Sequence, residues 1–233
     1  MWYYATVNSP VTTVAAIVVA AKIGGGDING NPRLRAVVEK ARAANMPKEN
    51  IEKAIKKGTG ELKGVTYEDI TYEGYGPAGV ALIIKTLTDN RKRTAAAVRS
   101  ILTKHGGNLG ENGCVSWMFK QKGIIILNGS EYNEDEITNL ALEIDAEDYQ
   151  LKGETWEIVL ESHDFEKAKE YLDKNNIKYE SAEITLIPNT YVKLSEKDAE
   201  KMIKLLDALD DNEDVQEVYV NFDIDDEIMN KYA

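Results

Sequence analysis

The sequence predicts an α+β protein that consists of an N-terminal three-helix domain and two ferredoxin-like βαββαβ domains, one inserted into the other. Two observations support this fold class. Apolar residues recur at helical spacing up to residue 58, whereas buried strands alternate with helices from residue 66 onward. Residues 123–187 also form one complete βαββαβ set, with an incomplete βαβ unit on each side of it. Joining the two incomplete units gives the nested arrangement, to which a tandem arrangement is the alternative.

Three helices are expected in the first domain. The apolar stretch of residues 11–21 ends at Lys22 after about half the length of a membrane span, which favours a helix packed in a core. Asn31-Pro32 is typical of an N-cap followed by proline at the first helical position, so a second helix begins there. Pro47 opens a third helix, which ends at residue 58.

Strands and helices alternate along the rest of the chain. In the incomplete units we expect strands at residues 79–86, 114–119, 190–194 and 215–222, and helices at residues 90–105 and 196–209. In the complete set we expect strands at residues 123–127, 148–151, 155–161 and 180–187, and helices at residues 134–144 and 164–175. The predicted domains are residues 1–64 (helical), residues 65–121 with 189–233 (discontinuous and ferredoxin-like) and residues 122–188 (inserted, acidic and ferredoxin-like).

The composition argues against several classes of protein. With one cysteine, Cys114, and two histidines, the chain cannot form an internal disulfide or a Cys/His zinc cluster. This composition indicates a reducing compartment, and we expect a cytoplasmic protein without a metal or another cofactor. No phosphate-loop, triad or metal-ligand motif supports an enzyme activity. The carboxylates within residues 207–214 lack the ligand pattern of an EF-hand, and we interpret them as a solvated acidic surface.

Charge is distributed unevenly along the chain, whose formal net charge is −12. Residues 1–127 contain 18 Lys and Arg against 10 Asp and Glu, whereas residues 128–233 contain 10 against 30. Within the basic half, residues 31–63 and residues 85–105 each have a balance of +5. A local positive field selects a polyanionic partner even when the whole chain is acidic. The two basic segments therefore predict binding to nucleic acid.

The cluster Arg91-Lys92-Arg93 is the most informative local feature. Three cations in the first turn of a helix oppose the helix dipole, at a cost of about 0.3–1 kcal/mol each when they are exposed. A helix N-terminus has free N–H donors, so cations placed there favour a bound phosphate, with Asp89 and Asn90 as the adjacent cap. The alternative is that these side chains pair with carboxylates of the acidic half.

Other cations are expected to extend this surface. On the third predicted helix Lys53, Lys56 and Lys57 fall at i, i+3 and i+4, which is typical of a basic face laid along a phosphate backbone. An ordinary solvated helix face is the alternative. The candidate nucleic-acid-binding residues are Arg33, Arg35, Lys40, Arg42, Lys53, Lys56, Lys57, Arg91, Lys92, Arg93, Arg99 and Lys104.

Three stretches carry specific motifs. Residues 24–61 are GGGDINGNPRLRAVVEKARAANMPKENIEKAIKKGTGE, residues 72–119 contain TDNRKRT and KHGGNLG, and residues 203–224 are IKLLDALDDNEDVQEVYVNFDI. With them the sequence strongly resembles the YebC/PmpR family, which includes the mitochondrial translational activator of cytochrome c oxidase. Before about residue 18 the resemblance ends, because Thr, Ala and Val stand where the family usually has a basic G-H-S-K-W segment and a Lys/Arg-rich helix. No site is expected there.

The resemblance implies a helical domain followed by two ferredoxin-like domains, one inserted into the other. It also implies a cytoplasmic, non-enzymatic factor, described either as a DNA-binding transcriptional regulator or as a ribosome-associated translation factor. The predicted partner is therefore DNA or ribosomal RNA, the latter within a ribosome. A protein-interaction adaptor that works through the acidic half and an enzyme that uses an interdomain cleft are the alternatives. A membrane partner is not predicted, and the sequence carries no signal for the oligomeric state.

Overall fold

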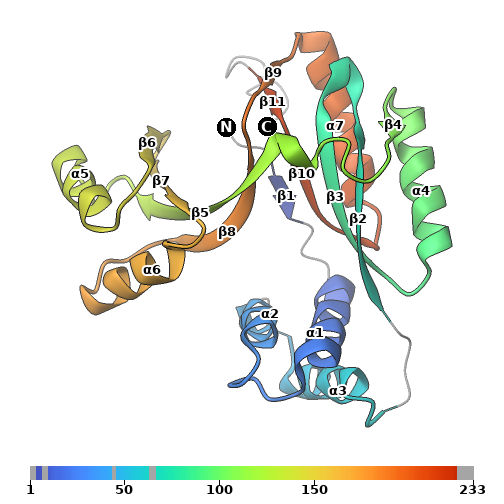
Figure 1. Ribbon diagram of the computed structural model, residues 1–233, viewed down its shortest axis with the longest axis horizontal. Coiled ribbons are helices and arrows are strands. Elements are labelled where there is room, and N and C mark those ends of the chain that lie inside the picture. The colour runs from blue at the N-terminus through green and yellow to red at the C-terminus, as the bar shows by residue number, and fades with distance from the viewer. Residues whose placement is uncertain (1–3, 7–9, 44–45, 63–66, 225–233) are drawn as a thin grey trace. The chain divides into compact units, whose positions relative to one another are not determined.

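The computed structural model describes residues 4–6, 10–43, 46–62 and 67–224 (Figure 1). By internal contacts the chain divides into two compact units. One spans residues 117–190 and is called the inserted unit. The other combines the chain before residue 117 with the chain after residue 190 and is called the discontinuous unit. The finer division into three domains, with boundaries near residues 64, 121 and 188, stays a prediction.

Three helices form the first part of the discontinuous unit, and their colour runs from blue to cyan in Figure 1. They are α1 (Pro10–Gly24), α2 (Pro32–Ala43) and α3 (Lys48–Gly58). Apolar side chains of all three helices, including Ile17, Leu34 and Ile51, are buried in one cluster. The predicted three-helix arrangement is confirmed.

Asn31 joins the end of α1 to the start of α2. Its side-chain oxygen accepts the backbone N–H of Leu34 at 3.0 Å, while its amide donates to the carbonyl oxygens of Ala20 at 2.9 Å and Gly25 at 2.8 Å. A Cβ atom on Gly24 would lie 2.6 Å from this amide, so a glycine is needed for the close approach. The N-cap predicted at this position is confirmed, and its amide also satisfies carbonyls at the end of α1.

The inserted unit is a four-stranded antiparallel sheet with two helices. Its elements are β5 (Phe119–Asn128), α5 (Glu134–Glu143), β6 (Asp148–Lys152), β7 (Thr155–Glu161), α6 (Phe165–Lys174) and β8 (Ser181–Pro188). The strand order is β6-β7-β5-β8, which is the ferredoxin-like order for a βαββαβ chain. Side chains from both helices and from the central strands, such as Ile125, Ile158 and Leu172, form its core.

The remainder of the discontinuous unit is a five-stranded sheet with two helices, and the chain follows a different path through it. Its main elements are β1 (Tyr4–Thr6), β2 (Glu68–Tyr75), β3 (Ala81–Thr88), α4 (Arg91–Lys104), β4 (Asn108–Leu109), α7 (Glu196–Asp210) and β10 (Val215–Val220). The sheet order is β1-β10-β3-β2-β4. Both α4 and α7 pack on one face of this sheet through a cluster that includes Val98, Leu205 and Ile84. The predicted α+β class with two ferredoxin-like units, one inserted into the other, is confirmed.

Two strand predictions in this unit are wrong. Of the strand predicted at residues 114–119, only Phe119 lies in a strand, as the first residue of β5. A turn and a 3₁₀ segment (Ser116–Met118) precede it, and the backbone N–H groups of residues 113, 115 and 116 bond to the Glu73 carboxylate. Residues 190–194 supply only β9 (Val192–Lys193), which pairs with β11 (Phe222–Asp223) in a separate two-stranded sheet. The strand beside β3 is instead β2, whose buried Glu73 and Gly74 break the apolar alternation typical of a strand.

Among the residues that the structure describes, no helix is long and apolar enough to cross a membrane.

Candidate nucleic-acid interface

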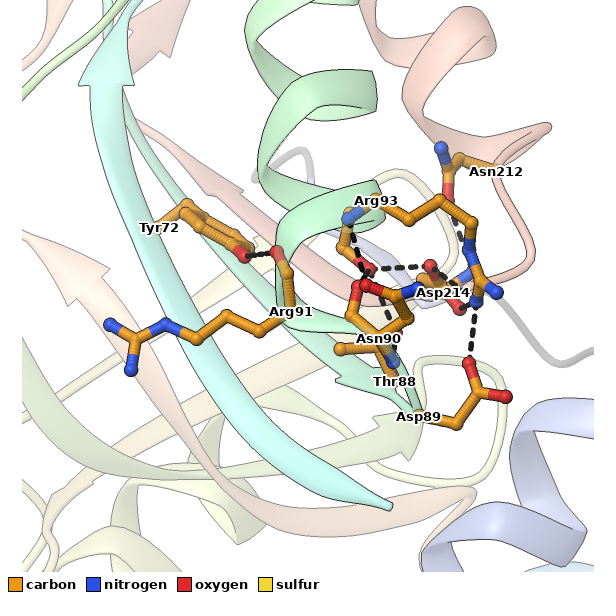
Figure 2. A network of polar contacts seen from close by, with 9 residues as sticks. Tyr72, Thr88, Asp89, Asn90, Arg91, Arg93, Asn212 and Asp214 are labelled. Carbon is orange, nitrogen blue, oxygen red and sulfur yellow. Dashed lines mark hydrogen bonds and ion pairs between the residues drawn. The ribbon is translucent and has the colours of Figure 1, made fainter. Parts of the chain in front are cut away.

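The first turn of α4 is held by side chains on both sides of its N-cap (Figure 2). The side-chain oxygen of Asn90 accepts the backbone N–H of Arg93 at 3.1 Å, which makes Asn90 the N-cap. The backbone N–H of Asn90 itself donates to the hydroxyl oxygen of Thr88 at 2.9 Å. The helix therefore begins where the sequence predicts, with three cations in its first turn.

Arg93 is engaged within the protein. Its guanidinium lies 2.8 Å from the carboxylate of Asp89 and 3.1 Å from that of Asp214. The hydrogen bond and charge of Asp214, followed by the hydrogen bond of Asp89, raise the pKa of the Arg93 guanidinium. Pairing with the acidic half, the alternative considered for the whole cluster, therefore describes this one arginine.

Arg91 and Lys92 differ from Arg93. Both residues are exposed, and in the described part of the chain neither side chain has an ion-pair partner. The Arg91 backbone carbonyl accepts the Tyr72 hydroxyl at 3.3 Å, and Figure 2 shows its guanidinium pointing away from Asp214. Two charges thus stay available at a helix end that the dipole makes favourable for an anion.

The rest of α4 continues this exposed basic surface. Arg99 lies seven residues after Lys92, about 10 Å further along the helix, and both are exposed, as is the short Ala96 between them. Lys104 is also exposed, at the end of the helix. Lys85 belongs to the same basic segment but lies in β3, and its charge is paired within the protein. Its ammonium pairs with Glu217 at 2.8 Å.

Helix α3 has a basic face that is exposed along its length. Lys53, Lys56 and Lys57 are exposed, while Ile51 and Ala54 are buried against the other helices. Within the described ranges no ion pair engages the three lysines. The predicted separation of an apolar stripe from a basic face is therefore present in the structure.

Helix α2 contributes fewer available charges than its sequence suggests. Arg33 pairs with Asp69, and Arg35 donates to the backbone carbonyl oxygens of residues 28 and 29. Lys40 of α2 acts on Glu217 of β10. Burial alone raises the pKa of Glu217, but hydrogen bonds from Lys85 and Tyr219, together with the charges of Lys85 and Lys40, lower it. Arg42 is exposed near the end of the helix.

The structure thus divides the twelve candidates by their surroundings. Arg33, Arg35 and Arg93 have partners within the protein, and Lys40 acts on Glu217. The residues with exposed charges and no ion pair in the described chain are Arg42, Lys53, Lys56, Lys57, Arg91, Lys92, Arg99 and Lys104. In the same described ranges no group of three or more His, Cys, Asp or Glu side chains is placed to hold a metal ion.

Two residues of this region carry no signal in the local sequence. The sequence assigns Asp214 to the solvated acidic surface, yet its side chain is only 16% exposed and pairs with Arg93. Thr88 is the last residue of β3, and its hydroxyl oxygen accepts the backbone N–H of the N-cap residue Asn90. Asp214 is 121 residues away from its arginine, so only the three-dimensional arrangement reveals the contact.

The chain combines a three-helix region with two ferredoxin-like units, and several of its helices have basic faces. It is therefore an α+β protein of the nested ferredoxin-like class with exposed basic helices. A family model described as "TACO1/YebC protein N-terminal domain" matches residues 12–61 of the chain. A second model, described as "TACO1/YebC second and third domain", matches residues 67–222. The chain belongs to the TACO1/YebC family, as the sequence resemblance predicts.

Named relatives and a solved structure agree with this assignment. The chain is 56% identical over 218 residues to the probable transcriptional regulatory protein GSU1074 of Geobacter sulfurreducens, covering 94% of this chain and 88% of the relative. It is 53% identical over 214 residues to a probable transcriptional regulatory protein of Dictyoglomus turgidum, with coverages of 91% and 86%. The crystal structure of a conserved hypothetical protein, Aq1575, from Aquifex aeolicus matches with a TM-score of 0.82 and 46% identity, covering 94% of this chain and 90% of that chain.

Proposed function

We propose that this protein is a non-enzymatic regulator of gene expression that binds nucleic acid through the cations of α3 and α4. The observation that supports this function best is the first turn of α4, where Arg91 and Lys92 stay exposed against the helix dipole. A cation in that position lowers helix stability unless an anion is bound. Nucleic-acid phosphates supply such anions at regular spacing.

Duplex DNA is the partner that we propose first, because the relatives are named as probable transcriptional regulatory proteins. Ribosomal RNA within a ribosome presents the same phosphate chemistry and is the second candidate. Both partners are consistent with a cytoplasmic location, which is part of this proposal. Binding to either would use the same cations and weaken as the salt concentration rises.

The test is a titration of labelled duplex DNA and of labelled RNA of equal length, followed by fluorescence anisotropy between 50 and 200 mM salt. For about five phosphate contacts the affinity falls on the order of 10²-fold or more over this range. The variants Arg91→Gln/Lys92→Gln and Lys53→Gln/Lys56→Gln/Lys57→Gln should each bind more weakly. Each lost contact should reduce the slope of log affinity against log salt by about 0.9 for duplex DNA.

The matched control is Lys178→Gln/Lys197→Gln, which removes two exposed lysines outside both basic segments. Its affinity should stay close to that of the parent. Sedimentation with ribosomes, with and without nuclease, then separates the two partners. A parent protein that binds neither nucleic acid, or that binds with a flat salt response, overturns the proposal. A complex that survives nuclease and ignores the Arg91 and Lys92 substitutions indicates a protein-interaction adaptor instead.

A further inference from the structure

We infer that Asp214 is a positioning residue of the nucleic-acid interface, which holds the first turn of α4 so that Arg91 and Lys92 face outward. The inference rests on the proposed function and assigns a role to an acidic residue that a polyanion would repel. If it is correct, the orientation of the cations at the start of α4 depends on a residue from the part of the chain that follows the inserted unit.

Both carboxylate oxygens of Asp214 are used in contacts with α4 (Figure 2). One oxygen accepts from the Arg93 guanidinium at 3.1 Å. The other accepts the Thr94 hydroxyl at 2.6 Å and lies 3.3 Å from the same guanidinium. Because the Asp214 side chain is mostly buried and Thr94 is fully buried, the contact between these two residues is shielded from water, whereas the Arg93 side chain is 55% exposed.

The backbone of Asp214 is fixed as well. Its N–H donates to the side-chain oxygen of Asn212 at 3.0 Å, and its carbonyl accepts the N–H of Leu87 at 2.8 Å. Leu87 lies near the end of β3, directly before the segment that leads into α4. Asp214 therefore connects the end of β3, the first turn of α4 and the turn before β10.

Thr88 and Thr94 extend the same connection to the helix cap. The two hydroxyl oxygens lie 2.8 Å apart, and Thr88 also accepts the N–H of Asn90. A chain of hydrogen bonds thus runs from the N-cap through two threonines to Asp214. Removing the carboxylate would leave Thr94 without its charged acceptor and release Arg93, so the outward orientation of the neighbouring cations would be less well held.

Asp89 provides a matched comparison, because it binds the same arginine without the other contacts. Its carboxylate lies 2.8 Å from the Arg93 guanidinium, as close as a normal ion pair allows, and its side chain is more exposed than that of Asp214. It also precedes the helix rather than coming from the far end of the chain. Asp89→Asn and Asp214→Asn therefore remove the same charge from the same partner.

The sign of the effect separates positioning from electrostatics. If only charge mattered, either substitution would remove repulsion and tighten binding to a polyanion. Positioning predicts that Asp214→Asn weakens binding by about 5- to 10-fold, the loss expected for a charge-assisted contact. Asp89→Asn should bind as the parent does or slightly more tightly.

The experiment is the anisotropy titration with duplex DNA and RNA, on the full chain, at a temperature where each variant is shown to be folded by circular dichroism. Each variant is made in the parent and in the Arg91→Gln/Lys92→Gln background. If Asp214 acts through Arg91 and Lys92, the Asp214→Asn effect disappears in that background. A purely structural role would leave the effect unchanged there, which would overturn the inference.

Two further variants complete the test. Thr94→Val keeps the net charge and the side-chain size, so it should weaken binding even if Asp214→Asn does not fold. Arg93→Gln should leave the salt slope close to that of the parent, whereas a direct phosphate contact by Arg93 would lower the slope by about 0.9. Failure of the parent to bind nucleic acid contradicts the proposed function. A parent that binds, with Asp214→Asn and Thr94→Val at least as tight, contradicts only the role of Asp214.

Discussion

Helices α4 and α5 occupy equivalent places in the two ferredoxin-like units, yet their first turns have opposite charge. Each follows a central strand of its sheet, β3 or β5, and each is capped by an asparagine whose side chain accepts the N–H three residues later. In α5 the first three residues are Glu134, Asp135 and Glu136. In α4 they are arginine, lysine and arginine. The dipole favours the first arrangement and disfavours the second.

The two helices also complete their caps in different ways. In α5 the Glu136 carboxylate accepts the backbone N–H of Asn133 at 2.8 Å, which closes a capping box within the helix itself. In α4 the corresponding N–H of Asn90 donates to Thr88, and the third residue, Arg93, is held by Asp214. The α4 start thus depends on residues outside the helix. The first turn of α5 has the charges that stabilise a helix, whereas the first turn of α4 has charges that stability alone does not explain.

The largest expected effect comes from giving α4 the charges of α5. In Arg91→Glu/Lys92→Asp the first two residues of α4 become those of α5, and the two proposed phosphate contacts are replaced by repulsion. Nucleic-acid affinity should fall on the order of 10²-fold or more. The measurement is fluorescence anisotropy at 100 mM salt.

Lys178→Glu/Lys197→Asp changes the net charge by the same amount at exposed positions outside the basic segments. It should reduce affinity far less, because neither lysine belongs to the proposed interface and salt screens the remaining repulsion. Equal losses in the two variants would show that total charge, and not the α4 start, governs binding.

A second contrast between the units concerns Glu73, whose side chain holds the loop at residues 113–116. The described residues of the inserted unit contain no counterpart of this arrangement. The Glu73 carboxylate accepts N–H groups from Gly113, Val115 and Ser116 at 2.8–2.9 Å. Glu73→Gln replaces one acceptor oxygen by a donor and should lower the free energy of unfolding by about 1–3 kcal/mol. Urea denaturation measures this, with exposed Glu68→Gln on the same strand as a control that should change little.

The same carboxylate gives a dependence on pH. Burial alone raises the pKa of Glu73, but the three backbone N–H groups outweigh this and lower it. A lowered pKa in the folded state stabilises the protein above the ordinary glutamate value of about 4.3, and the contribution disappears as the pH falls through the folded value. The parent should therefore lose stability more steeply than Glu73→Gln below that pH. Parallel curves would contradict the role of Glu73.

Local sequence signals account for the helices and for the exposed part of the site. Asn31 and Asn90 cap helices within three residues of themselves, so both helix starts could be predicted. The strand predicted at residues 114–119 failed because a distant carboxylate, Glu73, binds the N–H groups that a strand would use. Asp214 was missed for the same reason. Contacts between residues far apart in the chain leave no periodic pattern to detect.

Removing the caps should cost the two helices similar amounts of stability but have different functional results. Asn90→Ala and Asn133→Ala should each lower the free energy of unfolding by about 1 kcal/mol. Only Asn90→Ala should also weaken nucleic-acid binding, because it loosens the turn that carries Arg91 and Lys92. Thermal denaturation and anisotropy on the same samples give both quantities. Weaker binding by Asn133→Ala would break the proposed division between the two helices.

The smallest effects test the dipole argument directly. Arg91→Gln/Lys92→Gln and Glu134→Gln/Asp135→Asn neutralise two charges at matched positions after an asparagine cap. The first variant should raise, and the second lower, the free energy of unfolding by about 0.3–1 kcal/mol per charge at low salt. Urea denaturation at 20 mM and 500 mM salt checks the sign and the screening. If neutralising Arg91 and Lys92 instead destabilises the protein, the α4 charges are part of its folding, and their exposure is no longer an argument for a bound polyanion.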